Sequence, residues 1–327
     1  MATSTFSAVD EYGFERSLEF DFKYYERFMS EYIGILARRL KRWEDLSNSE
    51  RKKKSGTLKR FVRKGIPISL RESAWMTISG AEELKRNSKY SFNTLRKRKT
   101  NSVIKEAIEM DIPRTFPDNI FFDKDSTLPE QLLGILIAFA NSNTDIGYCQ
   151  GMNYIAGLLL LVTKNAESSF WLLKTLVERI LPQYYSKNMS GLITDLAVLD
   201  KLVQKNEPAV HRHIESIGLP WAVTTTKWFI CIYAEVLPTE TVLRIWDSIF
   251  YEGSKVIFRV ALTLIKMHRN KILECKDMTE LVKCFKEMGS HHGVINCHQF
   301  MKNVFRVPGS FPNKLLEDLR RQHNNSK

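Results

Sequence analysis

Two apolar runs, at residues 132–140 and 155–162, most constrain how this chain can fold. The first is apolar apart from Gly134, and neither contains a charged residue. Glycine (15 residues) and proline (10 residues) are sparse in the 327-residue chain, and the alternating patterns of half-buried strands are hard to find. We therefore expect both runs to form helices that are buried on nearly all sides, in an all-α protein. Each run is too short to cross a bilayer.

Helical spacing of apolar residues predicts further helices along the chain. We place them at 24–43, from Ser69 as a capping residue, from about Ser102, at 150–162, at 170–180, and in the C-terminal half at 226–237, 241–250 and 255–268. The stretch "SNSERKKKSGT" at 47–57 is expected to be a loop, and so is the basic stretch at 96–99. Apolar residues make up 43% of the chain, which is enough to bury a substantial core.

The chain carries a net charge of +12, and much of this charge is local. Residues 38–64 contain twelve Lys or Arg against three acidic residues, and residues 96–99 are all cations. Three interpretations stay open for these blocks: solvated mobile loops, contact with an acidic partner or an anionic lipid surface, or contact with nucleic acid. Aromatic residues are not interleaved with the cations as a stacking platform requires, and no zinc-finger or RNP pattern is present. We therefore do not expect a nucleic-acid partner.

Several kinds of site are not supported by the sequence. The N-terminal stretch "MATSTFSAVDEYGFER" lacks the apolar core of a secretory signal, and the five cysteines are scattered without a CxxC pair, so we expect reduced thiols in the cytoplasm. No GxxxxGK[ST] or GxGxxG loop is present to hold a nucleotide. The pairs at 291–292 and 297–298 do not have the spacing of a standard zinc site, and His211 and His213 are expected to be structural. We expect no metal site and no cofactor of the chain's own.

The stretch "IEMDIPRTFPDN" at 108–119 places Arg114 between two prolines, just past a predicted helix end. Pro113 cannot supply a helical N–H and should push Ile112 out of helical geometry, and the second proline starts another turn. Asp111 is positioned to brace this loop or to pair with a basic side chain. Two interpretations stay open. Arg114 is either a structural or solvent-exposed residue, or the turn exists to present its guanidinium.

A second polar residue in an unusual setting is Gln150, in the stretch "GYCQGMNYIAG" at 147–157. We expect it at the start of the buried helix 150–162, directly before Gly151. It is either an ordinary first-turn residue or a primary amide held rigidly at the mouth of a cleft. A primary amide both donates and accepts hydrogen bonds, as is needed to hold a water while touching a phosphate oxygen.

An arginine on a constrained loop and a glutamine at a rigid helix start match the two non-metal groups that phosphoryl hydrolysis requires. A guanidinium neutralises the charge that builds on the γ-phosphate oxygens, and an amide orients the attacking water. A chain with both groups and no phosphate-binding loop is expected to act on a nucleotide that another protein holds.

The same two stretches resemble the paired signature motifs of the TBC domain, the Rab GTPase-activating family. The first motif is Ile108-x-x-Asp111-x-x-Arg114, and the second is Tyr148-x-Gln150. Both occur in the family's order, and neither finger position departs from the family pattern.

Other stretches agree with this family. They are Arg71 and Trp75 with Ser79-Gly80, and "RIWD" at 244–247. The likeness covers roughly residues 60–305.

The resemblance implies an all-helical, two-lobed domain with a groove that receives a Rab. It implies that Arg114 is an arginine finger and Gln150 a glutamine finger, supplied in trans to a GTP-bound Rab that carries both the GTP and the Mg²⁺. Four further residues would shape the site: Asp111, Tyr148, Arg71 and Trp75. Trp75 and Trp246 are expected to serve packing rather than chemistry. The protein would then activate a partner enzyme in vesicle trafficking rather than act as an enzyme itself.

On this basis the chain divides into three parts. An N-terminal helix and basic linker (1–59) precede the TBC domain (60–305), which has a lobe boundary near 182–191, and a C-terminal helix or tail (306–327) follows. We expect a cytoplasmic protein, peripheral to endomembranes, with the basic segments available for contact with an anionic membrane. The alternative function is a Rab-binding adaptor or scaffold with little catalytic effect.

Overall fold

The computed structural model describes residues 8–123 and 125–325. Within these residues it is helical, and the β-type pairing consists of two isolated antiparallel bridges, Val9 with Glu15 and Phe14 with Asn119. The all-α fold class predicted from the sequence is confirmed. No helix in the described ranges is long and apolar enough to cross a membrane.

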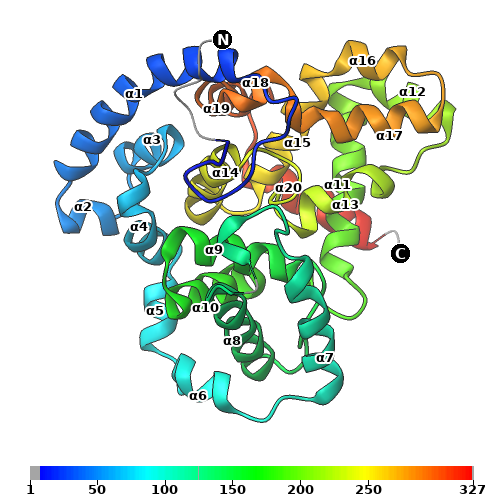
Figure 1. Ribbon diagram of the computed structural model, residues 1–327. Coiled ribbons are helices and arrows are strands. Elements are labelled where there is room, and N and C mark those ends of the chain that lie inside the picture. The colour runs from blue at the N-terminus through cyan, green and yellow to red at the C-terminus, as the bar shows by residue number, and fades with distance from the viewer. Residues whose placement is uncertain (1–7, 124, 326–327) are drawn as a thin grey trace. The chain divides into compact units, whose positions relative to one another are not determined.

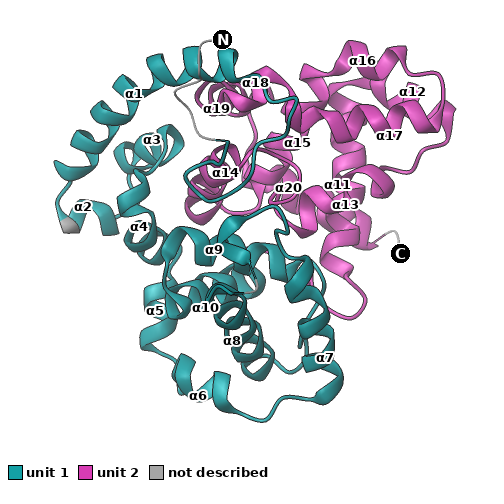
Figure 2. Ribbon diagram, in the orientation of Figure 1, with its two compact units in different colours: residues 1–179 teal, residues 180–327 magenta. Residues whose placement is uncertain are grey.

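The chain separates into two compact units, residues 1–179 and 180–327 (Figure 2). The division lies just before the lobe boundary predicted at 182–191. The segment 1–59, which the sequence places outside the TBC domain, belongs to the first unit, although residues 1–7 lie outside the described residues. The predicted C-terminal tail contains a packed helix, and its last two residues also lie outside the described ones.

The first unit contains α-helices and three short 3-10 helices among its described residues. They are α1 (Phe22–Glu44), α2 (Asn48–Lys52), α3 (Gly56–Lys64), η1 (Ile68–Leu70), α4 (Arg71–Ile78), α5 (Ala81–Arg86), α6 (Phe92–Lys97), α7 (Ser102–Asp111), η2 (Ile112–Arg114), η3 (Ile120–Phe122), α8 (Leu128–Ser142), α9 (Met152–Thr163) and α10 (Ala166–Thr175). A π-helical turn, η4 (Leu176–Ile180), follows at the division between the units.

The centre of the first unit is α9, which packs against α4, α8 and α10 (Figure 1). Every residue of α9 is buried except Tyr154, which is half-buried, because its sequence is apolar around the whole helix. Both apolar runs thus form helices as expected, but only α9 is buried on nearly all sides, because Leu133, Gly134 and Ile137 leave one face of α8 half-buried. A helix enclosed in this way gives the turn at its N-terminus a fixed support.

The second unit is built from the remaining helices. They are α11 (Ser190–Asn206), α12 (Pro208–Ile217), α13 (Trp221–Ile230), α14 (Thr239–Glu252), α15 (Lys255–Met267), α16 (Arg269–Glu274), α17 (Met278–Glu287), η5 (Met288–Ser290), α18 (His292–Ile295), α19 (Cys297–Arg306) and α20 (Asn313–Asn325). Here α11 packs against α12, α13, α15 and α20. Arg320 of α20 binds the buried Asp195 of α11 through two hydrogen bonds of 2.6 and 2.7 Å, so the C-terminal helix is part of this unit.

The prediction that residues 47–57 form a loop is wrong. Ser47 and Glu50 form a capping box that starts α2, and Ser55 caps α3, so most of this stretch is helical. Arg51 donates from Nη2 to the Trp43 carbonyl at 2.5 Å, which ties α2 to the end of α1. The basic stretch at 96–99 is likewise half helical, because α6 ends at Lys97.

Two predicted helix limits also differ from the structure. Ser69 lies inside η1 instead of capping a helix, and α4 begins at Arg71. The helix expected at 226–237 begins earlier and ends at Ile230, after which Ile232 and Tyr233 have positive φ values of 48° and 65°. Trp246 donates from Nε1 to the Ile232 carbonyl at 2.9 Å, so a distant side chain stabilises this turn.

Candidate functional site

The turn that carries Arg114 continues directly from α7. Ile112 keeps helical angles (φ −57°, ψ −52°), so the prediction that Pro113 pushes it out of helical geometry is wrong. The chain continues instead as the 3-10 helix η2, in which the Thr115 N–H donates to the Ile112 carbonyl at 3.1 Å. This turn needs no N–H from Pro113, so the proline does not disrupt it. The backbone becomes extended only at Thr115, so Arg114 is exposed at the end of a short, regular turn.

The Asp111 carboxylate, which is 3% exposed, joins the two predicted motifs. Its Oδ1 accepts a hydrogen bond from Arg114 Nε at 2.6 Å and also contacts Nη2 of the same guanidinium. Its Oδ2 accepts from the Tyr148 hydroxyl at 2.5 Å. Burial raises the pKa of Tyr148 and the Asp111 carboxylate raises it further, so the phenol stays a proton donor. Because the Arg114 side chain is 56% exposed, a buried anion holds a cation that remains open to solvent.

A second set of hydrogen bonds ties the Arg114 turn to the turn before α9. Thr115 Oγ1 donates to the Asp111 carbonyl at 2.7 Å and accepts from Asn153 Nδ2 at 2.9 Å. Asn153 Oδ1 accepts in turn from the Gly151 N–H at 3.0 Å. Asn153 is not among the site residues predicted from the sequence, although an amide inside an otherwise apolar run is a visible signal. The two predicted motifs are therefore connected through buried polar groups.

Gln150 lies in that second turn and is exposed. The prediction that it opens the helix is wrong by two residues, because α9 begins at Met152 and Gly151 takes the N-cap position with φ 107°. Local hydrogen bonds set this later start of the helix. The Asn153 side chain accepts from the Gly151 N–H, and the Met152 N–H donates to the Cys149 carbonyl at 3.2 Å. Within the described part of the chain, the side-chain amide of Gln150 makes no hydrogen bond.

The backbone around Arg114 rests directly on α9. A Cβ atom at Gly157 would lie 3.0 Å from Phe116 Cε2 and 3.2 Å from Thr115 Cγ2, so the glycine allows this close approach. Phe116 has φ 54°, which is rare for a bulky residue, and its ring packs edge-on against Tyr154 at 5.6 Å between centroids. The Tyr154 hydroxyl donates to the Arg114 carbonyl at 3.4 Å. Close packing thus constrains the loop on the side that faces the helix.

Arg71 and Trp75, the other predicted site-shaping residues, lie on α4 and are 1% and 0% exposed. Arg71 donates from Nη1 to the Tyr12 hydroxyl at 2.7 Å, so it holds the N-terminal segment of the first unit. Full burial of Trp75 is what a packing role requires. Trp246, in the second unit, is 1% exposed, and its Nε1 donates to the Ile232 carbonyl in the turn after α13. The influence of Arg71 and Trp75 on activity stays a prediction.

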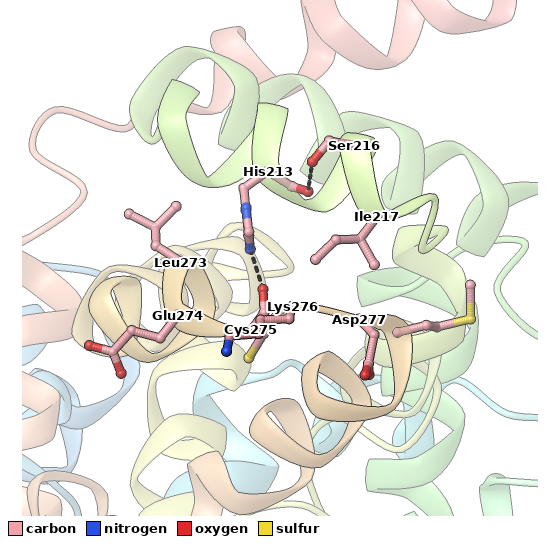
Figure 3. Close-up of a pocket in the computed structure, with 9 residues that line it drawn as sticks. His213, Ser216, Ile217, Leu273, Glu274, Cys275, Lys276 and Asp277 are labelled. Carbon is pink, nitrogen blue, oxygen red and sulfur yellow. Dashed lines mark hydrogen bonds between the residues drawn. The ribbon is translucent and has the colours of Figure 1, made fainter.

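Two further kinds of site come into question among the described residues, a metal centre and a surface hollow. No group of three or more His, Cys, Asp or Glu that could hold a metal occurs among the described residues. An open hollow in the second unit lies between α12, α16 and the start of α17 (Figure 3). His213 there donates from Nε2 to the Cys275 carbonyl at 2.9 Å, and Ser216 donates to the His213 carbonyl at 2.7 Å. Because both side chains bind backbone, they have the structural role expected for His213.

Comparison with known proteins identifies one family. The model of the Rab-GTPase-TBC domain matches residues 68–273, a range that contains both predicted finger positions. "Growth hormone-regulated TBC protein 1" of Xenopus laevis is 44% identical over 324 residues, 98% of this chain and 95% of that protein. The Homo sapiens protein of the same name is 46% identical over 315 residues, 95% of this chain and 94% of that protein.

Two solved structures are similar to this one. The Chlamydomonas flagellar RabGAP TBC domain superposes with a TM-score of 0.75 and 30% identity, over 91% of this chain and 99% of that one. The Ypt/Rab-GAP domain of Gyp1p superposes with a TM-score of 0.69 over 89% of this chain and 99% of that one. At 16% identity, the second likeness is one of fold alone.

Proposed function

The chain belongs to the Rab-GTPase-TBC domain family, and on that premise we propose that it accelerates GTP hydrolysis by a Rab-family small GTPase in its GTP-bound form. The observation that carries this proposal is the Arg114 turn. An exposed guanidinium is held by a buried carboxylate, on a loop packed against a fixed helix. The similar Chlamydomonas structure, a flagellar RabGAP TBC domain, supports the same activity.

In this mechanism Arg114 acts on the transition state of the partner's reaction. Negative charge spreads over the γ-phosphate oxygens during phosphoryl transfer, and a guanidinium supplied in trans stabilises it. Asp111 engages Nε and Nη2 on one edge of the guanidinium, which leaves the other N–H groups available for phosphate oxygens. Because the turn already orients the side chain, little reorganisation is needed when charge develops.

Gln150 has the second role in the proposal. Its primary amide would accept a hydrogen bond from the attacking water and donate to a phosphate oxygen. The exposure of Gln150 and the hydrogen bonds that fix the Gly151 turn beside it support this role. The partner would carry both GTP and Mg²⁺, so the chain would act as an activator and would hold no cofactor of its own.

A hydrolysis screen tests the proposal. A panel of GTP-loaded Rab proteins is mixed with the full-length chain, and phosphate release is followed in a single turnover. We expect wild-type protein to accelerate at least one Rab, and Arg114→Ala to lose that effect. Binding to GTP-loaded Rab without acceleration would replace this proposal with the adaptor function.

A Rab partner implies a cytoplasmic location at the surface of endomembranes, with a role in vesicle trafficking. The cations at 52–54 and 96–99 are exposed, which supports an additional peripheral contact with an anionic membrane.

A further inference from the structure

Residues 8–16 form a small hairpin, here called the N-terminal strap (dark blue in Figure 1). Asp10 Oδ1 accepts hydrogen bonds from the N–H groups of Tyr12 and Phe14, both at 2.9 Å. The Gly13 N–H bonds the Asp10 carbonyl at 3.1 Å, and Gly13 has φ 88°, a left-handed angle that glycine adopts easily. The strap therefore has a defined conformation, although it lies well before the family match that begins at residue 68.

The strap pairs with the segment that follows Arg114. We call residues 112–122 the finger loop. Three hydrogen bonds join the two: from the Glu15 N–H to the Asp118 carbonyl (2.9 Å), from the Ile120 N–H to the Gly13 carbonyl (3.0 Å), and from Asn119 Nδ2 to the Tyr12 carbonyl (2.9 Å). Asn119 is 3% exposed, and its Oδ1 also accepts from the Phe121 N–H at 2.9 Å. One buried amide thus holds both the strap and the end of the loop.

Side-chain packing adds to these bonds. The Phe14 ring lies edge-on to the Phe116 ring at 5.0 Å between centroids, and Phe116 is only two residues after Arg114. A Cβ atom at Gly13 would lie 2.4 Å from Phe121 Cδ2, so the strap backbone touches this ring closely. Two phenylalanine rings of the finger loop, Phe116 and Phe121, therefore pack against the strap in addition to the three hydrogen bonds.

Arg71 fixes the strap to the body of the unit. Its Nη1 donates to the Tyr12 hydroxyl at 2.7 Å, with Tyr12 4% exposed and Arg71 1% exposed. A buried charged donor makes this a stronger bond than one between neutral groups. The contact links α4, inside the family match, to the finger loop through a segment outside that match.

We propose that the strap is a positioning element for Arg114, with Tyr12 on the strap and Asn119 on the finger loop as the positioning residues. This inference rests on the finger role proposed above for Arg114. The finger loop begins and ends in single 3-10 turns, η2 and η3, but its centre includes the unfavourable φ of Phe116, so its conformation depends on the groups packed around it. A positioning error of about 1 Å costs roughly 10²-fold in rate. Loosening the strap should therefore reduce the rate of hydrolysis in the complex more than the affinity for the Rab.

The test uses two variants of the full chain. Asn119→Ala removes the bonds to both the strap and Phe121, whereas Tyr12→Phe removes only the hydroxyl that binds Arg71 and keeps the ring. Two matched controls are Leu18→Ala, at a fully exposed residue just past the strap, and Tyr90→Phe, at a tyrosine that is 47% exposed on another segment. Circular dichroism melting checks that each variant is folded. If Asn119→Ala does not fold, the milder Tyr12→Phe decides.

The first measurement needs no partner. Hydrogen exchange of the amides in residues 112–122 is compared between wild-type protein and each variant. We expect exchange there to rise about tenfold in Asn119→Ala and severalfold in Tyr12→Phe, because the strap bonds limit local opening. The controls should match wild-type protein. Unchanged exchange in both variants would show that the strap does not restrain the finger loop, and this result would not depend on any measurement with a Rab.

The second measurement is single-turnover hydrolysis on a Rab that the wild-type protein stimulates. We expect the maximal rate to fall about 10- to 100-fold in Asn119→Ala and severalfold in Tyr12→Phe, while the half-saturating concentration changes less than about twofold. If the variants show faster hydrogen exchange in residues 112–122 but keep the maximal hydrolysis rate of the wild-type protein, the strap does not position Arg114. If wild-type protein stimulates no Rab, the function proposed above fails, and the exchange measurement alone decides whether the strap holds the loop.

Discussion

Asp111 shows how one buried carboxylate organises the turn that carries Arg114. A buried charge is costly unless it is paired and hydrogen-bonded, and Asp111 is satisfied by the Arg114 guanidinium and the Tyr148 hydroxyl. The same bonds orient Arg114 while leaving it exposed. The Ile108-x-x-Asp111-x-x-Arg114 and Tyr148-x-Gln150 motifs are therefore parts of one hydrogen-bonded arrangement, because Tyr148 binds the carboxylate that binds Arg114.

At Arg114 we predict that substitution removes activity without removing the fold. Arg114→Ala should lose about 10³-fold or more of the acceleration, the range typical of an arginine finger. Arg114→Lys should also be poor, because one ammonium cannot reproduce the planar, forked donor set. Single-turnover phosphate release measures both. Near wild-type acceleration by Arg114→Ala would contradict the finger assignment, and Arg86→Ala, at another exposed arginine, is the matched control.

At Tyr148 we predict a smaller effect through Asp111. Tyr148→Phe deletes one hydrogen bond to a buried carboxylate, so unfolding free energy should fall by about 1–3 kcal/mol and the maximal rate by about tenfold. The raised pKa means that this contribution is complete below the ordinary tyrosine pKa of about 10 and is lost as pH rises beyond it. The gap in melting temperature between the two proteins should therefore stay constant from pH 7 to pH 9.5. The gap should narrow as the pH rises above about 10, and a gap that stays constant there would show that folding does not raise the pKa of Tyr148.

At the scale of single elements, α9 supports both predicted motifs. The turn of Gln150 precedes its first residue, and the Arg114 loop rests on Gly157 in its middle. Apolar residues around the whole helix predict its burial, but not the exact start, since the start depends on the Asn153 side chain and the left-handed Gly151. Boundaries set by such local bonds are not visible in hydrophobic spacing.

A pair of glycine substitutions tests the support from α9. Gly157→Ala favours the helix by up to about 1 kcal/mol but places a Cβ 3.0 Å from Phe116, so Phe116 must move by a few tenths of an ångström. We expect unfolding free energy to change by less than about 1 kcal/mol while the maximal hydrolysis rate falls severalfold. Gly134→Ala on α8 meets no atom within 4 Å, so it should gain about 0.5–1 kcal/mol and keep full activity. Equal maximal hydrolysis rates in the two variants would show that the close contact between Gly157 and Phe116 does not support the Arg114 loop.

The basic segment at 47–57 shows a second kind of error. Its charge favours a loop, yet Ser47 and Glu50 have the spacing of a capping box, which is enough to start α2. The capping box is a local sequence signal, and it outweighs the effect of the charge. By contrast, the turn after α13 depends on Trp246, which bonds the carbonyl of a residue 14 positions away, and no local pattern reveals it.

At the scale of the whole molecule, composition and two motifs are enough to predict an all-α member of this family, whereas the strap is not predictable. Asn119 and Tyr12 lie 107 residues apart, and Arg71 and Tyr12 lie 59 apart. Contacts at this separation follow from tertiary packing, which single-sequence patterns do not encode. The motifs predict Arg114 and Gln150 together with Asp111 and Tyr148, whose side chains hold Arg114. They do not predict four residues that support the two turns through longer-range contacts: Thr115, Asn119, Asn153 and Gly157.

The exposed cations at 52–54 and 96–99 lead to a prediction about recruitment. Changing each block to glutamine should weaken binding to liposomes that contain anionic lipid, and wild-type binding should fall as salt rises. Turnover of a soluble Rab at saturating concentration should stay the same. Lys201, Lys205 and Lys302, exposed in the second unit, are the matched control set. A collapse of soluble turnover would instead place the basic residues in the catalytic interface.

In the proposed mechanism this chain supplies two groups, Arg114 and Gln150, to the GTP of its partner. Many GTPases orient the attacking water with a glutamine of their own, and an activator then adds only an arginine. Replacing that glutamine with leucine would block such an activator. It would not block one that provides the amide itself.

The most direct test is single-turnover phosphate release for four combinations: wild-type protein or Gln150→Ala, with the normal Rab or its Gln-to-Leu form. We predict that wild-type protein still stimulates the Gln-to-Leu Rab substantially, and that Gln150→Ala stimulates neither form while keeping its fold. An unresponsive Gln-to-Leu Rab, together with a normal Rab that still responds to Gln150→Ala, would contradict the two-finger account even if Arg114 proves essential.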